Sequence, residues 1–137
     1  MLRYLLDTNI VSQPVAKAPA ASVLRKLRSV GDQCAIATPV WHELQYGCKR
    51  LPVGKRREAL EDYLTEVVQI SFPILAYDEA AAKRHAAERA RLEESGTTLP
   101  FVDGQIAAIA VINELVLVTS HVKDFAPFTG LMVESWA

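Results

Sequence analysis

The sequence lacks the features that mark several protein classes. Its two cysteines, Cys34 and Cys48, form no CxxC pair and lie near no histidine cluster, which argues against a zinc site and gives little reason for a disulfide. No apolar run approaches the roughly 18 residues that a membrane-spanning helix needs, and the first apolar run is too short for a signal peptide. We therefore expect a protein of the reducing cytoplasm with no membrane contact.

An excess of one charge sign is also missing. The formal net charge is −1 and the pI is about 6.3, which excludes a broadly basic binder but allows local basic patches. The P-loop pattern and the GxGxxG pattern are both absent, so nothing supports the nucleotide-binding classes that depend on those loops.

What is present fits one α/β domain covering residues 1–137. Half of the residues are hydrophobic, so a chain of this length can build one substantial core. Short apolar runs alternate with helical patterns, which favours a mainly parallel sheet of four to five strands flanked by helices. We expect strands at 2–6, 34–37, 70–75 (an edge strand, because it contains Pro73), 115–119 and 131–135. Helices are expected after Asp7 with a break near Pro14, and at 19–30, from Thr38 as N-cap, 55–68, from Asp78 as N-cap to 95–96, and 100–113.

Three acids occupy positions that are unusual for surface acids. Asp7 follows the first strand directly, Asp103 lies on the apolar stripe of its helix, and Glu43 lies beside apolar neighbours on another helix. Each alone has an ordinary explanation: an N-cap, a first-turn acid that interacts with the helix dipole, or a partly exposed glutamate. Together they suggest more, because parallel sheets place sites beyond the carboxyl ends of their strands. If the acids converge, their repulsion raises the pKa of at least one of them unless a divalent cation lies among them.

With these residues in place, the chain resembles the PIN-domain ribonucleases, and within them the VapC-type toxins of toxin–antitoxin pairs. The resemblance is carried by four stretches that span the chain: LLDTNIV, TPVWHELQYG, LPFVDGQIAAIAV and LVLVTSHVKDF. It implies a metal-dependent endoribonuclease in which Asp7, Glu43 and Asp103 hold Mg²⁺ or Mn²⁺. It also implies supporting roles for Asn9 and Thr119, a homodimer, a small VapB-like antitoxin partner, and a structured RNA such as tRNA as substrate.

The chain departs from the family pattern at one position. Where the family has a further acid or an asparagine after the fourth strand, this sequence has His121. His121 is compatible with a softer metal, with a phosphate contact, or with a site that has three acids only. Asp124, three residues further on, could contribute to the site through water, but its KDF context also suits a plain turn residue, which we favour.

Basic residues cluster in two places. The candidate RNA-binding cluster follows Glu43 and consists of Lys49, Arg50, Lys55, Arg56 and Arg57. A second cluster, at residues 83–91, is interleaved with acids and is interpreted as a solvated helix face. The histidine next to Glu43, His42, is interpreted as a structural histidine, because adjacent helix positions point in different directions.

Other functions fit the sequence less well. A phosphotransfer receiver domain needs an acid after a mid-chain strand, and this chain has KRLPVGKRRE there. A haloacid-dehalogenase-type phosphatase needs D-x-D where this chain has D-T-N. A catalytically silent PIN-like module that binds RNA or protein stays open because of His121.

Overall fold

Five short strands form one parallel sheet in the computed structural model, which describes residues 1–137. The strands are β1 (Tyr4–Leu6), β2 (Cys34–Ala37), β3 (Ile74–Leu75), β4 (Val116–Val118) and β5 (Val133–Glu134). Their order across the sheet is β3-β2-β1-β4-β5, and every neighbouring pair runs parallel. This confirms the predicted α/β fold with a parallel sheet. Because β1 lies at the centre, the residues that follow it stand at the middle of the sheet's carboxyl edge.

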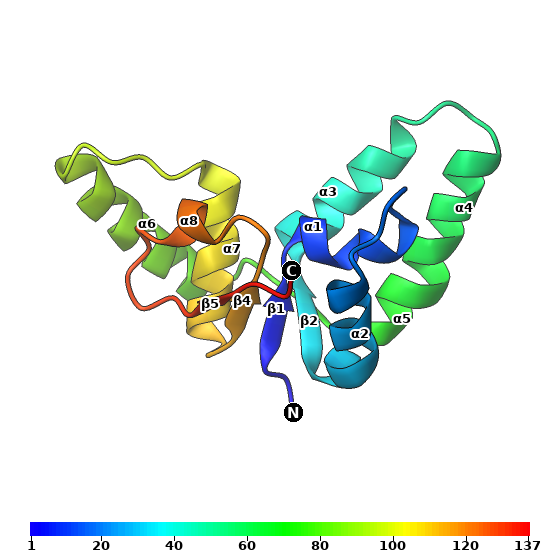
Figure 1. Ribbon diagram of the computed structural model, residues 1–137. Coiled ribbons are helices and arrows are strands. Elements are labelled where there is room, and N and C mark those ends of the chain that lie inside the picture. The colour runs from blue at the N-terminus through cyan, green and yellow to red at the C-terminus, as the bar shows by residue number, and fades with distance from the viewer.

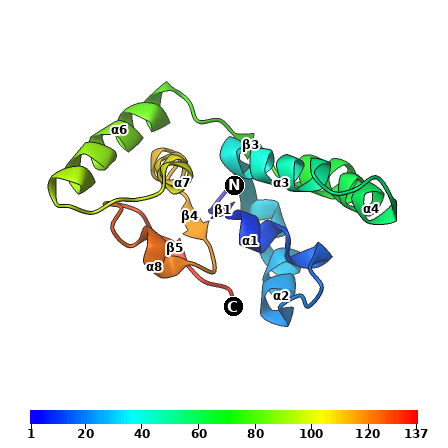
Figure 2. The same ribbon diagram turned by 90° about the horizontal axis from the view of Figure 1, so that it is seen from above.

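The connections between strands are helical, as parallel strands require. In chain order the α-helices are α1 (Thr8–Val11), α2 (Ala21–Val30), α3 (Thr38–Lys49), α4 (Lys55–Tyr63), α5 (Gln69–Ser71), α6 (Glu79–Glu94), α7 (Phe101–Ile112) and α8 (Val122–Phe125). Short 3₁₀ segments at Gln13–Val15 and Gly31–Gln33 precede and follow α2, and a π-helical segment at Leu64–Val68 joins α4 to α5. Helices α6, α7 and α8 gather on one side of the molecule and α1 to α5 on the other (Figures 1 and 2). No helix combines the length and the apolar character that crossing a bilayer requires.

The predicted caps were right at one helix and wrong at another. The Asp78 side chain accepts the Ala81 N–H at 2.9 Å and caps α6, as expected. Thr38 is not an N-cap: α3 already begins at Thr38, and Ala37 precedes it without a side-chain bond. The Thr38 hydroxyl instead accepts the Tyr77 N–H, at 3.3 Å, from the segment between β3 and α6. The Thr38 hydroxyl therefore makes a tertiary hydrogen bond instead of capping α3, as the local sequence pattern had predicted.

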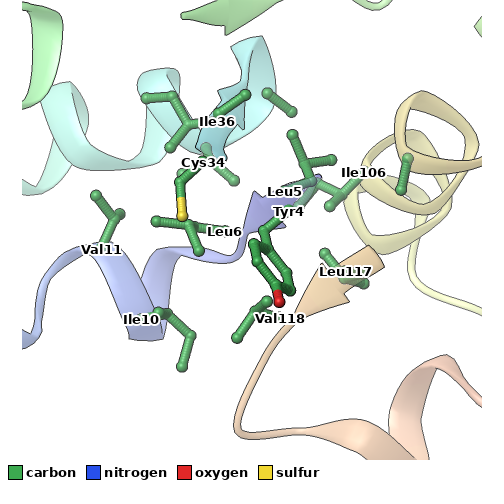
Figure 3. Packing of buried hydrophobic residues seen from close by; sticks show 14 of the residues in the cluster. Tyr4, Leu5, Leu6, Ile10, Val11, Cys34, Ile36, Ile106, Leu117 and Val118 are labelled. Atoms are coloured by element: carbon green, nitrogen blue, oxygen red, sulfur yellow. The ribbon is translucent and has the colours of Figure 1, made fainter. Parts of the chain in front are cut away.

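The core lies along β1 and its neighbours. Leu5 and Leu6 are fully buried, and Figure 3 shows them among side chains of β2, β4 and α7, including Cys34, Leu117 and Ile106. Full burial of one such leucine contributes about 1.5–3 kcal/mol. Cys34 and Cys48 are buried and unpaired, which agrees with the absence of a disulfide framework. Burial, together with the nearby Asp32 charge, raises the pKa of the Cys34 thiol to about 12.

One buried carboxylate joins α6 to the segment before β5. The Glu88 side chain is 3% exposed and accepts hydrogen bonds from Arg84 at 3.1 Å, from Arg91 at 2.8 Å and from the Thr129 N–H at 3.1 Å. Burial by itself raises the pKa of Glu88, but these hydrogen bonds outweigh it and hold the pKa at about 2. These hydrogen bonds anchor the segment between α8 and β5 to α6.

Candidate active site at the carboxyl edge of the sheet

Asp7 is held rigidly where β1 ends. Its N–H donates to the Val118 carbonyl at 2.9 Å, which continues the pairing of β1 with β4 by one residue. One carboxylate oxygen, Oδ1, accepts the Thr8 N–H at 2.8 Å, so Asp7 does cap α1. The other, Oδ2, accepts the Thr119 hydroxyl at 2.8 Å and the Asn9 amide at 3.1 Å. A carboxylate offers about four acceptor positions, so roughly one is left for another partner.

Asn9 and Thr119 form the frame around this carboxylate. The Thr119 hydroxyl is completely buried and also accepts the His121 N–H at 3.0 Å. The Asn9 side chain donates to Asp7 and accepts the Ser120 N–H at 3.0 Å, which links the end of β1 to the end of β4. The structure therefore brings both predicted supporting residues into direct contact with Asp7 or its hydrogen-bonding partners.

Asp103 shares the electrostatic environment of Asp7. It lies half-buried in the first turn of α7. Burial raises the pKa of Asp103, and the negative charges of Asp7, Asp124 and Glu43 raise it further, while His121 lowers it. The repulsion that the sequence predicted for converging acids is therefore present at Asp103.

Glu43 reaches the same region from α3. Its side chain is exposed and lines two grooves. One, of about 430 Å³, runs between α1, α3 and α4 and is also lined by Thr8 and Arg56. The other, of about 390 Å³, lies between α3 and α7 and is also lined by Tyr77 and Val102. Glu43 thus stands where the two grooves meet.

Two predictions made near this site need correction. Asp124 is not a turn residue: it lies in the short helix α8, and its charge acts on Asp103 more strongly than that of Glu43. The pattern KDF did not reveal this, because only the folded chain brings the charge of Asp124 near Asp103. The interpretation of His42 as a structural histidine is wrong: its side chain is exposed, and its ring stacks on the exposed Tyr46 one turn later, with ring centres 6.4 Å apart. His121 is also exposed, at the N-cap position of α8.

The donor set suits a hard divalent cation that keeps part of its water shell. The nearby ligands are carboxylate, hydroxyl and amide oxygens, which Mg²⁺ and Mn²⁺ prefer to sulfur. No three acidic, histidine or cysteine side chains lie together as a metal-ligating cluster. Mg²⁺ typically takes one or two carboxylates and retains several waters, so these oxygen donors suit it better than they suit structural zinc, which prefers sulfur and nitrogen ligands.

The basic residues that follow Glu43 divide into two groups. Lys49 and Arg57 both pair with Glu61, at 3.8 and 3.0 Å. Arg50, Lys55 and Arg56 are exposed and form no ion pair, which leaves them available to phosphate. In the second cluster Arg84 and Arg91 pair with Glu88, and Arg89 pairs with Glu93 at 3.4 Å, so that surface is largely neutralised.

Comparison with known proteins agrees with this fold. Residues 4–126 match the family model of the PIN domain. The chain is 31% identical to "Ribonuclease VapC2" of Haemophilus influenzae, covering 99% of both chains, and 30% identical to "tRNA(fMet)-specific endonuclease VapC" of Shigella flexneri, covering all of both. Among solved structures, VapBC2 of Rickettsia felis bound to a DNA fragment from its promoter superposes with a TM-score of 0.83 at 26% identity, covering 99% of this chain and 100% of that one. The chain therefore belongs to the PIN-domain family and, within it, to the VapC group.

Proposed function

We propose that this protein is a divalent-metal-dependent endoribonuclease, the toxin of a toxin–antitoxin pair, acting in the cytoplasm on a structured RNA such as tRNA. The observation that carries the proposal is the convergence of charge at the sheet edge. Asp7 is fixed there by three hydrogen bonds, and burial, together with the charges of Asp7, Asp124 and Glu43, raises the pKa of Asp103. Such an arrangement is costly unless a cation offsets it.

Each residue of the site has a distinct part. Asp7, Glu43 and Asp103 would hold Mg²⁺ or Mn²⁺, with Asp124 in reach to contribute charge. Asn9 and Thr119 orient Asp7 and, together with the Thr8 N–H, fill about three of its four acceptor positions, which leaves roughly one for a metal. When bound, the ion supplies an activated water and neutralises charge that develops on the phosphodiester.

The RNA would reach this site along the groove that Glu43 shares with Arg56. Arg56 lines that groove and carries no ion pair, so it can contact a phosphate next to the scissile one. Arg50 and Lys55 extend the same positive surface, and the contribution of all three is expected to weaken with salt. The names of the Shigella and Rickettsia proteins support a tRNA substrate and a VapB-like antitoxin for this chain, which we further propose acts as a homodimer.

RNA cleavage in the presence and absence of Mg²⁺ or Mn²⁺ tests the proposal. Wild-type protein is expected to cut RNA only with metal, and Asp7→Asn and Asp103→Asn are each expected to abolish cutting while the protein stays folded. Asp62→Asn is the matched control, because Asp62 is an exposed acid on α4 that forms no hydrogen bond or ion pair. Binding of RNA without any cutting would favour the catalytically silent module, and equal cutting by all three variants would remove the proposed roles.

A further inference from the structure

A buried histidine lies directly beneath the helix turn that carries Asp103. His85, on α6, is 4% exposed, and its Nδ1 forms a 2.8 Å hydrogen bond with the Tyr77 hydroxyl. The centre of its ring also lies 4.9 Å from the centre of the Phe101 ring at the start of α7. Burial lowers the pKa of His85, and the Arg89 charge lowers it further, so the ring is neutral at pH 7. The nuclease site does not use this side chain directly.

The His85 ring occupies the space that a side chain at position 104 would need. A Cβ added to Gly104 would lie 2.2 Å from His85 Nε2 and 2.6 Å from Cδ2, far inside contact distance. Gly104 is buried within α7, where a glycine costs about 1 kcal/mol relative to alanine. The sequence accepts this cost because the imidazole packs against the α7 backbone. Gly104 follows Asp103 directly, so the His85 ring fixes how closely the helix turn that carries the Asp103 carboxylate can approach α6.

The same histidine is connected to the helix that carries Glu43. Its partner Tyr77 donates its backbone N–H to Thr38 at the start of α3. Tyr77, Thr38 and Glu43 line one side of the groove between α3 and α7, and Val102 and Gln105 line the other. A chain of contacts therefore runs from α3 through Tyr77 and His85 to the first turn of α7.

We propose that His85 is a positioning residue, which through Tyr77 and Gly104 fixes the separation between Asp103 and Glu43 and so the metal affinity of the site. The proposal rests on the proposed function, because it assigns those two acids to the metal. Residues that orient metal ligands commonly change affinity by about 10–100-fold when they are altered. His85 differs from an ordinary core residue in that its ring packs against the helix turn that carries Asp103.

Substitutions that add a side chain at Gly104 and remove one at His85, alone and together, test this proposal. Gly104→Ala is expected to push the α7 turn away from the His85 ring and weaken Mn²⁺ binding roughly tenfold. His85→Ala is expected to weaken it less, and the double variant is expected to recover affinity, because removing the ring makes room for the new methyl group. Gly47→Ala is the matched control: Gly47 lies in α3 and a Cβ there meets nothing within 4 Å, so this helix glycine is expected to tolerate the change.

Two readouts separate positioning from simple stability. Mn²⁺ titration gives Kd, and amide NMR shifts of residues 38–43 and 101–105 in metal-free protein report the two helix turns. A purely structural role would lower the melting temperature of the variants and leave Kd unchanged at temperatures where they are folded, which would overturn the proposal. If Gly104→Ala does not fold, His85→Asn decides: it keeps a polar atom near Nδ1 for Tyr77 and is expected to retain more affinity than His85→Ala.

The outcomes distinguish this proposal from the function on which it rests. A wild-type protein that binds no Mn²⁺ would overturn the nuclease function itself. A wild type that binds Mn²⁺, with shifted amide signals but wild-type Kd in all the variants, would overturn the positioning role alone. Recovery of both Kd and amide shifts in the double variant would support it.

Discussion

Replacing Thr119 with valine should destabilise the protein, chiefly through the loss of the hydrogen bond from the Thr119 hydroxyl to Asp7 and also because the His121 N–H loses its acceptor. Valine has nearly the same shape as threonine, so the buried site keeps its packing and loses the hydroxyl alone. That hydroxyl is completely buried and donates at 2.8 Å to a carboxylate that is itself 8% exposed. A hydrogen bond to a charged group contributes about 1.5–3 kcal/mol, so we expect a loss of about 2 kcal/mol in the free energy of unfolding.

Urea unfolding followed by tryptophan fluorescence measures this loss, and thermal unfolding should show a melting temperature lower by roughly 6–8 °C. Ser120→Ala is the control next in the chain, because Ser120 is exposed and its hydroxyl makes no hydrogen bond; it should change stability by less than about 0.5 kcal/mol. The effect of Thr119→Val should also shrink in an Asp7→Asn background, since the charge that strengthens the bond is gone. Equal losses in both backgrounds would refute the reasoning, because they would show that the hydroxyl stabilises something other than the carboxylate.

Four further outcomes follow from the structure. Glu88→Gln should lower the free energy of unfolding by about 3 kcal/mol at neutral pH, because the pKa of Glu88 is held below its ordinary value of 4.5. In urea titrations this difference from wild type should vanish as the pH falls from about 4.5 to 2. A difference that persists at pH 2 would contradict the prediction. Asp124→Asn removes a like charge and should lower the pKa of Asp103, measured by carboxyl carbon NMR; an unchanged value would separate α8 from the site. Cys34, buried and with its pKa raised to about 12, should react with a thiol reagent only after unfolding, and rapid labelling of native protein would disprove its burial. Arg56→Gln should weaken RNA binding and reduce its salt dependence, measured from binding isotherms at several salt concentrations. Lys83→Gln, on α6, is the control variant and should leave both unchanged.

Much of the fold could be predicted because local signals and tertiary structure agree. The strand at 34–37 was predicted to the residue, and the Asp78 cap and the break near Pro14 follow from side-chain chemistry within a few residues. The exceptions are places where a distant segment competes. Thr38 lost its capping role to Tyr77, and the helix expected to end at residue 68 continues through a π-helical segment to Ser71.

The site divides in the same way. The resemblance of four sequence stretches to the PIN-domain ribonucleases pointed to a metal-dependent nuclease, and the positions of three acids indicated a candidate site, because a parallel sheet delivers the carboxyl ends of its strands to one edge. Only the tertiary structure decided which groups surround those acids: the Thr119 hydroxyl on Asp7, the charge of Asp124 near Asp103, and the His85 ring beneath Gly104. These contacts join residues far apart in the chain, and local periodicity carries no information about which side chains meet across helices or strand ends.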